Sequence, residues 1–147
     1  MGDTKHPTPT FRDTTSLLRY LYTDLTRISQ VSSEDIVLHP ADRAIRPREP
    51  LRGIVAAQAH EEALIAATGG TLVMDVQSIS ANNNFGAVLG ILRSKRKRVT
   101  AEGRLLEEEN LAIPFCGVWR FVNGKAVEHW ENATDPAELG RWLGPKL

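Results

Sequence analysis

The sequence predicts a single α+β domain in which helices pack on one face of a strongly bent antiparallel sheet. Helical periodicity dominates the first 70 residues, and four strand-like segments follow it. The length of 147 residues also suits one domain, because a chain of this size can bury a core without disulfides or metal. The predicted order is helix, short strand, helix, antiparallel meander and closing helix.

The first part of the chain is predicted to be a flexible tail followed by a long amphipathic helix. Residues 1–10 lack periodicity, so the domain is expected to span 11–147. Over residues 14–30, apolar side chains including Tyr22 recur at steps of three and four, which is the spacing of one helix face. Asp13, Thr14 and Thr15 are each a candidate N-cap for this helix.

A short strand and a second helix are expected next. Residues 36–39 form an extended run that ends with His39 at Pro40, because proline restricts the residue before it. Residues 53–68 are dense in alanine and leucine and stop at two glycines, which predicts a helix with a glycine terminator.

The remaining residues predict a meander and a closing helix. Asp135 and Pro136 provide an N-cap and a first-turn proline for a helix that continues to Trp142. Asn123 and Gly124 are the residues that tight hairpin turns prefer. The four predicted strands are 71–80, 86–93, 112–122 and 125–132.

The register of the last hairpin decides which face of its second strand meets the core. His129 and Glu131 share one face of that strand, and Glu128 lies on the other. A two-residue turn would pair Trp119 with Glu128, whereas a three-residue turn with a glycine bulge would pair Gly117 with His129. The sequence permits both registers.

Composition argues against several classes of partner. The 18 basic and 18 acidic residues balance, so no global field favours nucleic acid or an anionic membrane. Cys116 is the single cysteine and cannot form an internal disulfide. We expect a cytoplasmic protein, because no run has the ~18 apolar residues of a membrane span and the first residues lack the apolar core of a signal peptide.

Two charged clusters are interpreted as structural. The basic run 95–98 lacks interleaved aromatic residues and is soon balanced by the glutamates at 107–109, which is typical of a solvated hairpin tip. His60, Glu61 and Glu62 lack the second histidine of a zinc-protease motif. No metal site is therefore expected.

One segment carries a family resemblance. Residues 115–132, FCGVWRFVNGKAVEHWEN, resemble the final hairpin of the SnoaL-like branch of the nuclear transport factor 2-like superfamily. The upstream order agrees over residues 11–142, except in the charged stretch 93–110. The resemblance implies a curved sheet wrapped around helices, an open-ended, cone-shaped pocket, and a homodimer. The superfamily includes isomerases, dehydratases, epoxide hydrolases, polyketide cyclases and proteins without catalysis.

The resemblance also implies a catalytic group in the last strand. Glu131 falls where SnoaL-type cyclases hold their catalytic aspartate, if the glycine-bulge register holds, and His129 or His39 is the expected proton-transfer partner. We expect burial to raise the pKa of Glu131 toward neutrality. The cyclases carry a histidine where this chain has Gly117. The expected pocket lining is Phe115, Gly117, Trp119, Phe121, Tyr22 and Asp75.

Structural alternatives exist for these residues. Glu131 is as consistent with a solvated carboxylate at the sheet rim, and His39 with a capping residue before Pro40. Asp75, an acid in an apolar strand, either faces the pocket or lies exposed on the convex face. Trp130, on the opposite face of the last strand from Glu131, is expected in a dimer interface.

Two functions fit these observations. One is a cofactor-free enzyme of small-molecule metabolism, an isomerase, cyclase, dehydratase or related lyase that uses acid–base chemistry on a small hydrophobic ligand. The other is a non-catalytic binding or dimerisation module with the same fold. Epoxide hydrolysis would need two aspartates and an arginine around a water, and no such set falls on one face.

Overall fold

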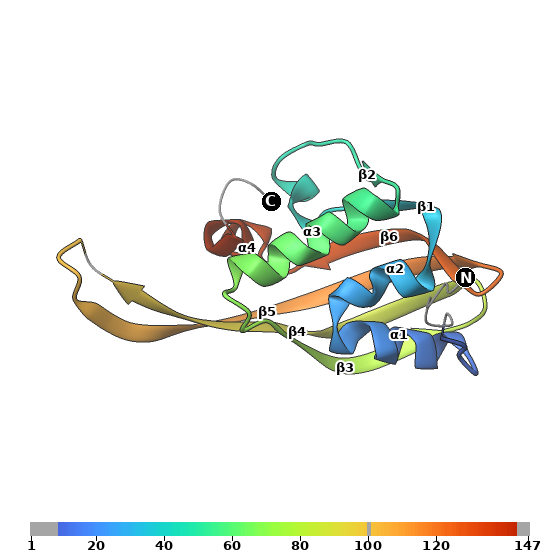
Figure 1. Cartoon of the computed structure of the whole chain (residues 1–147), viewed down its shortest axis with the longest axis horizontal. Coiled ribbons are helices and arrows are strands. Elements are labelled where there is room, and N and C mark those ends of the chain that lie inside the picture. The colour runs from blue at the N-terminus through green and yellow to red at the C-terminus, as the bar shows by residue number, and fades with distance from the viewer. Residues whose placement is uncertain (1–8, 100, 144–147) are drawn as a thin grey trace, which may run out of the picture.

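The computed structural model describes residues 9–99 and 101–143 and has helices on one side of a long, bent sheet (Figure 1). For 96–99, 105–107 and 142–143 only the backbone is described. Residues 1–8 of the predicted tail lie outside the described residues. No helix within the described ranges has the length and apolar character needed to cross a membrane.

The sheet has six strands in the order β2-β1-β6-β5-β4-β3. Neighbouring strands are antiparallel except for β1 and β6, which are parallel. The last strand therefore lies inside the sheet, between the first long strand and the meander. The strands are β1 Ser32–His39, β2 Leu51–Arg52, β3 Val73–Ala81, β4 Phe85–Val99, β5 Leu105–Val122 and β6 Lys125–Ala133.

The predicted first helix is interrupted at Asp24. This residue leaves the helical conformation, with φ −159° and ψ 104°, and its carboxylate accepts a hydrogen bond from the Thr26 backbone N–H at 3.0 Å. Asp24 thus ends one helix and caps the next. The helices are α1 Thr14–Thr23, η1 Leu25–Arg27, α2 Ile28–Val31, η2 Ala41–Ala44, α3 Ile54–Ala67 and α4 Pro136–Leu143.

The β4–β5 hairpin is much longer than predicted and projects from the body as an arm (Figure 1). The charged stretch 93–110 was expected to depart from the family resemblance, with a solvated hairpin tip at 95–98. Most of this stretch is strand. Its register sets Arg96 opposite Glu109 and Lys97 opposite Glu108. The side chains of 96–98 lie outside the described set.

The β5–β6 register differs from both predicted registers. Asn123 and Gly124 form a two-residue turn with positive φ, and Val122 pairs with Lys125. A shift between Arg120 and Phe121 leaves Val127 as an extra residue, a bulge that the sequence did not reveal. Trp119 consequently pairs with His129 rather than with Glu128, and Gly117 pairs with Glu131 rather than with His129.

The helices and the concave face of the sheet enclose the core. Leu18 and Leu21 of α1 are fully buried, as are Trp119 and Phe121 of β5. A second apolar cluster at the base of the arm contains Leu92, Leu111, Ile113 and Leu139.

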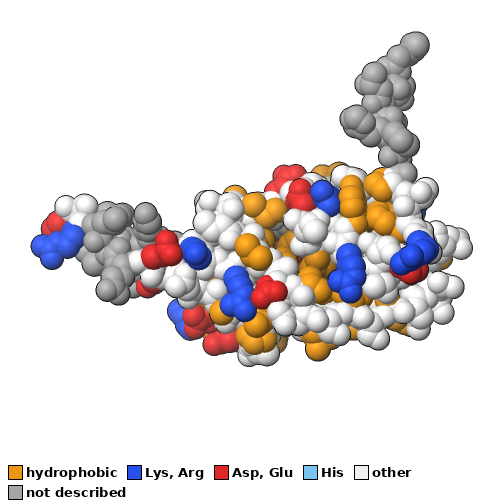
Figure 2. Space-filling view, turned by 90° about the horizontal axis from the view of Figure 1, so that it is seen from below, with side chains coloured by type: hydrophobic (Ala, Val, Ile, Leu, Met, Phe, Trp, Pro, Cys, Tyr) orange, Lys and Arg blue, Asp and Glu red, His pale blue; other side chains and the backbone are white. Residues whose placement is uncertain are grey.

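The opposite face of the sheet is partly apolar. Register places Phe85 and Leu89 of β4 on this face together with Val118 and Trp130. Phe85 is 50% exposed and Leu89 47% exposed. The view from below shows apolar side chains distributed among charged ones (Figure 2).

Candidate functional site

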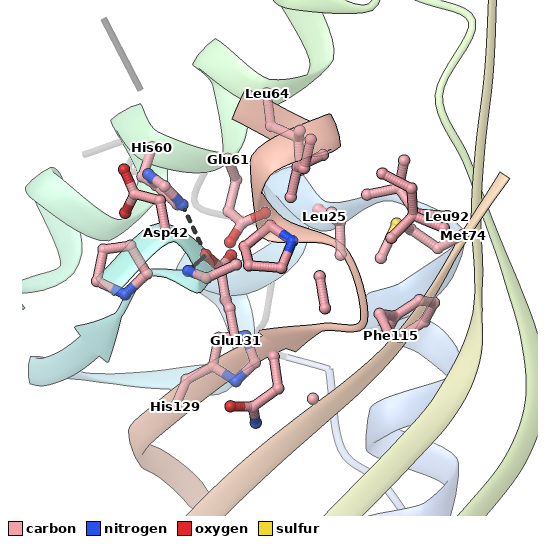
Figure 3. Close-up of a pocket in the computed structure, with 18 of the residues that line it drawn as sticks. Leu25, Asp42, His60, Glu61, Leu64, Met74, Leu92, Phe115, His129 and Glu131 are labelled. Carbon is pink, nitrogen blue, oxygen red and sulfur yellow. Dashed lines mark hydrogen bonds and ion pairs between the residues drawn. The ribbon is translucent and has the colours of Figure 1, made fainter. Parts of the chain in front are cut away.

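A cavity of about 550 Å³ lies between the concave face of the sheet and the helices. This volume is within the usual range for a pocket that holds one small organic molecule. Most of the wall is apolar, and the polar side chains gather toward one end (Figure 3). The apolar wall includes Leu21, Leu25, Ile28, Leu64, Met74, Leu92, Ile113, Phe115 and Leu139.

Helix α3 contributes two of the polar residues, His60 and Glu61. The buried residues of this helix are Ala57, Glu61 and Leu64, at the spacing that forms one helix face. Glu61 is thereby directed into the molecule, and His60 beside it is 12% exposed in its side chain. Both line the cavity with Glu131 of β6 (Figure 3).

His60 and Glu131 form a buried ion pair. The His60 Nε2 atom lies 3.0 Å from Glu131 Oε1, and the Ala41 backbone N–H donates to the same oxygen at 3.2 Å. Burial alone would raise the pKa of Glu131, but the charge and hydrogen bond of His60 outweigh it and lower this pKa to about 2. Burial would lower the pKa of His60, yet Glu131 raises it to about 9. The pair is thus charged at neutral pH.

Glu61 has the opposite electrostatic setting. It is 3% exposed, and burial followed by the negative charge of Glu131 raises its pKa well above the usual range. Its Oε2 atom has no hydrogen-bond partner among the described residues. These influences favour a protonated Glu61 beside an ionised Glu131, so the two environments separate the roles of the carboxyl groups.

His129 is a neutral, immobilised imidazole. Its ring stacks on Trp119 with centroids 3.5 Å apart, and its Nδ1–H donates to the Val118 carbonyl at 3.0 Å. Burial lowers the pKa of His129 to about 4, which leaves Nε2 unprotonated.

Tyr22 places a phenol on the pocket wall. Trp119 Nε1–H donates to the Tyr22 hydroxyl at 3.0 Å, and the Tyr22 ring is nearly parallel to Phe115. Burial raises the pKa of the phenol, so the hydroxyl keeps its proton. The hydroxyl lies over Gly117, where a Cβ atom would collide with it. Glycine at 117 therefore makes room for Tyr22.

The structure brings six of the predicted site residues to the cavity and leaves three outside. Within the set that lines it are Tyr22, Phe115, Gly117, Trp119, His129 and Glu131. His39 points to the opposite face of the sheet, where its Nε2 lies 2.7 Å from Glu128 Oε2 and its ring stacks on Trp130. His39 pairs with Trp130 in the β1–β6 register, so its side chain lies on the same outer face of the sheet and does not reach the pocket.

Asp75 and Phe121 are the other corrections. Arg93 Nε binds the Asp75 carboxylate at 3.0 Å at the partly exposed edge of the sheet, so the acid is paired instead of facing the pocket. Phe121 is 2% exposed but packs in the core. The expected direction of the Glu131 pKa is also wrong, because its partner His60 had not been recognised.

Sequence reasoning passed over His60 and Glu61 as site residues. The available signal was an acid at a buried helix position, four residues after Ala57 and three before Leu64. Their donor atoms and that of Glu131 lie within 4.8 Å of one another, a spacing that could hold a metal ion. The sequence of α3 contains only two of the three donor residues. The third, Glu131, lies on β6.

Comparisons with known proteins support the fold. No protein-family model matches the chain, and no curated protein matches it. A candidate SnoaL-like polyketide cyclase from Jannaschia sp. CCS1 superposes with a TM-score of 0.68 at 13% identity, covering 98% of this chain and 99% of that one. IdmH, a candidate polyketide cyclase from Streptomyces antibioticus, gives 0.66 at 18% identity, covering 89% and 98%.

A third structure gives the fold its usual name. A nuclear transport factor 2-like protein of unknown function from Burkholderia pseudomallei superposes with a TM-score of 0.58 at 20% identity, covering 89% of this chain and 97% of that one. All three identities are low, so the similarity concerns the backbone. The curved sheet, its helices and these superpositions show that the chain has the fold of the nuclear transport factor 2-like superfamily.

Proposed function

We propose that the protein is a cofactor-free acid–base enzyme that acts on a small, largely apolar carbonyl compound. The supporting observation is the pair of carboxyl groups on one wall of an apolar cavity, with Glu131 ionised and Glu61 protonated. Carboxyl pairs whose environments separate their pKa values supply a base and an acid in one site. The candidate cyclases with this fold are consistent with small-molecule chemistry.

The proposed first step is enolisation. Glu131 takes a proton from the carbon beside the substrate carbonyl, and the carbonyl oxygen receives the Glu61 proton, which leaves a neutral enol and a Glu61 carboxylate. Isomerases, cyclases, dehydratases and related lyases share such a step and differ in how the enol then reacts. His60 is a positioning residue, since it holds the Glu131 carboxylate through the bond at 3.0 Å.

Tyr22 supplies a second hydrogen-bond donor to the same oxygen. Trp119 Nε1–H already donates to the phenol oxygen, so the Tyr22 O–H is left for a group in the cavity. Donors fixed before the reaction stabilise the charge that develops on an oxygen, and an apolar wall strengthens this effect.

A non-catalytic binding module is the second candidate. The observation that favours it is the low pKa of Glu131, because a carboxylate held near pKa 2 by His60 is a weak base. In that case the pocket and its ion pair would serve recognition alone.

Proton exchange on a simple ketone separates the two candidates. The probe is 2-tetralone, an apolar bicyclic ketone, incubated in D₂O with the protein while NMR follows deuterium entering beside the carbonyl. We expect exchange faster than in buffer and a fall of ~10²- to 10⁴-fold in Glu131→Gln. Binding without any acceleration of exchange would support the module.

The matched control is Glu62→Gln. Glu62 follows Glu61 on α3 but is exposed and binds Gln58, so this variant should exchange 2-tetralone at the wild-type rate. Glu61→Gln should slow exchange, because the acid is lost while the side-chain volume is kept. The wild-type rate should also persist in a chelator, since no step passes through a metal.

A further inference from the structure

A surface hollow lies behind the pocket and shares part of its wall. The residues that line both the pocket and the hollow are Tyr22, Leu25 and Met74. The hollow lies between the end of α1, the end of α3 and the edge strand β3. These three residues therefore form a partition between the pocket and the hollow.

The three members of this partition differ in how firmly they are held. Tyr22 is 6% exposed and bound by Trp119, and Leu25 is 8% exposed in the core. Met74 lies on β3 at the edge of the sheet and is only partly buried. An unbranched methionine changes rotamer more easily than a packed aromatic or branched side chain. Met74 is thus the side chain best able to move aside.

The pocket is polar at one end and apolar at the other (Figure 3), and the hollow adjoins the apolar end. His60, Glu61 and Glu131 gather at one end of the pocket, and Met74 lies toward the other (Figure 3). Beyond Met74 the hollow has apolar walls from Ile65, Leu72, Val73 and Val76, of which Val73 is 55% exposed. Arg19, Thr23 and Asp24 complete the lining of the hollow.

We propose that Met74 closes a second opening of the pocket, and that the ligand is an amphiphile with an alkyl chain. Its polar end binds at Glu61 and Glu131, and its chain passes between Met74 and Leu25 into the hollow. The inference rests on the proposed function only for the position of the polar end. The apolar walls of the hollow are the observation that selects a chain as the occupant, because they would cover its methylene groups.

The test measures affinity along a series of 4-n-alkylphenols from butyl to dodecyl by isothermal titration calorimetry. Each methylene that enters an apolar environment should raise affinity about three- to fourfold. In the wild type we expect this rise to continue through the long chains. In Met74→Trp, which fills the opening, it should stop at a shorter chain.

Val73→Glu tests the hollow without altering the pocket. Val73 lines only the hollow and is exposed, so the substitution should keep the affinity for butylphenol and weaken dodecylphenol at least tenfold. Val122→Glu, the same change at a 47% exposed site beside the β5–β6 turn, is the control and should weaken neither.

Three results would overturn the inference. One is a wild-type affinity that stops rising at the same chain length as in Met74→Trp. Another is a dodecylphenol affinity unchanged by Val73→Glu, and the last is that no alkylphenol binds. Because these readouts are affinities, a protein that binds long chains but fails to exchange 2-tetralone would reject the enzyme proposal alone.

Discussion

The imidazole of His60 on α3 lies 3.0 Å from the carboxylate of Glu131 on β6, two residues separated by 71 positions in the chain. This contact joins the helix layer to the sheet at the polar end of a largely apolar cavity (Figure 3). It also influences the protonation of its surroundings, since burial raises the pKa of neighbouring Glu61 and the ionised Glu131 raises it further.

The ion pair should contribute measurably to stability. Removing one partner of a buried pair leaves an uncompensated charge, so His60→Gln should lower the free energy of unfolding by roughly 3–5 kcal/mol. Glu131→Gln should have a similar cost. The double variant should lose less than the sum of the two, and urea unfolding of all four proteins at pH 7 provides the coupling energy. If the stability loss of the double variant equalled the sum of the two single losses, the pair would not interact in solution.

Three buried groups should shape the pH dependence of stability, and Glu61, with its raised pKa, should lose its contribution as pH rises above about 4.5. The pKa of His129 is depressed to about 4, so the folded state binds fewer protons than the unfolded state below pH 6.5, and stability falls as pH drops toward 4. The pKa of His60 is raised to about 9, so its contribution is complete below 6.5 and is lost as pH rises toward 9. Unfolding midpoints measured from pH 4 to 9 give a stability profile with an acid limb below pH 6.5 and an alkaline limb above it.

Each limb has its own control variant. His129→Phe keeps an aromatic ring beside Trp119 but cannot titrate, so the acid limb should become shallower. His60→Gln should flatten the alkaline limb and leave the acid limb in place. A profile that both substitutions leave unchanged would assign the pH dependence to other groups.

Gly117→Ala should disturb Tyr22. The added methyl group would collide with the Tyr22 hydroxyl, and overpacking of a buried site costs about 1–3 kcal/mol. Proton exchange on 2-tetralone should slow as well, because the donor is displaced. Gly140→Ala in α4 is the control for unfolding, since its Cβ meets no atom within 4 Å and the change should stabilise the helix slightly. Gly140 also lines the cavity, so this variant does not serve as a control for exchange.

We expect a homodimer in which the outer faces of two sheets meet. Trp130 is half-buried there beside His39, and Phe85 and Leu89 add exposed apolar area to the same face. Trp130→Glu should dissociate the dimer in analytical ultracentrifugation while alkylphenol affinity persists. The same change at Val55, 82% exposed on α3, should leave the association intact. A wild-type monomer at micromolar concentration would exclude this arrangement.

Sequence patterns predicted those features that depend only on residues close together in the chain. Alternation along the last hairpin grouped His129 with Glu131, and the two face the cavity together. The bulge at Val127 was not predicted, because no glycine or other turn residue marks that position in the sequence. His60 and Glu61 were missed because their partner is distant in sequence and becomes a neighbour only when α3 packs over β6.

The central position of β6 has a consequence for biogenesis. The strand pairs with β1 on one side and β5 on the other, yet it is made after both. Until Lys125–Ala133 leave the ribosome, β1 and β5 each present an unpaired edge, and Glu131 is not available to His60. The pairing of β1 with β6 joins strands that are far apart in the sequence, and pairings of this kind are slow to form. The nascent chain therefore passes through an aggregation-prone interval that only the synthesis of its last strand can end.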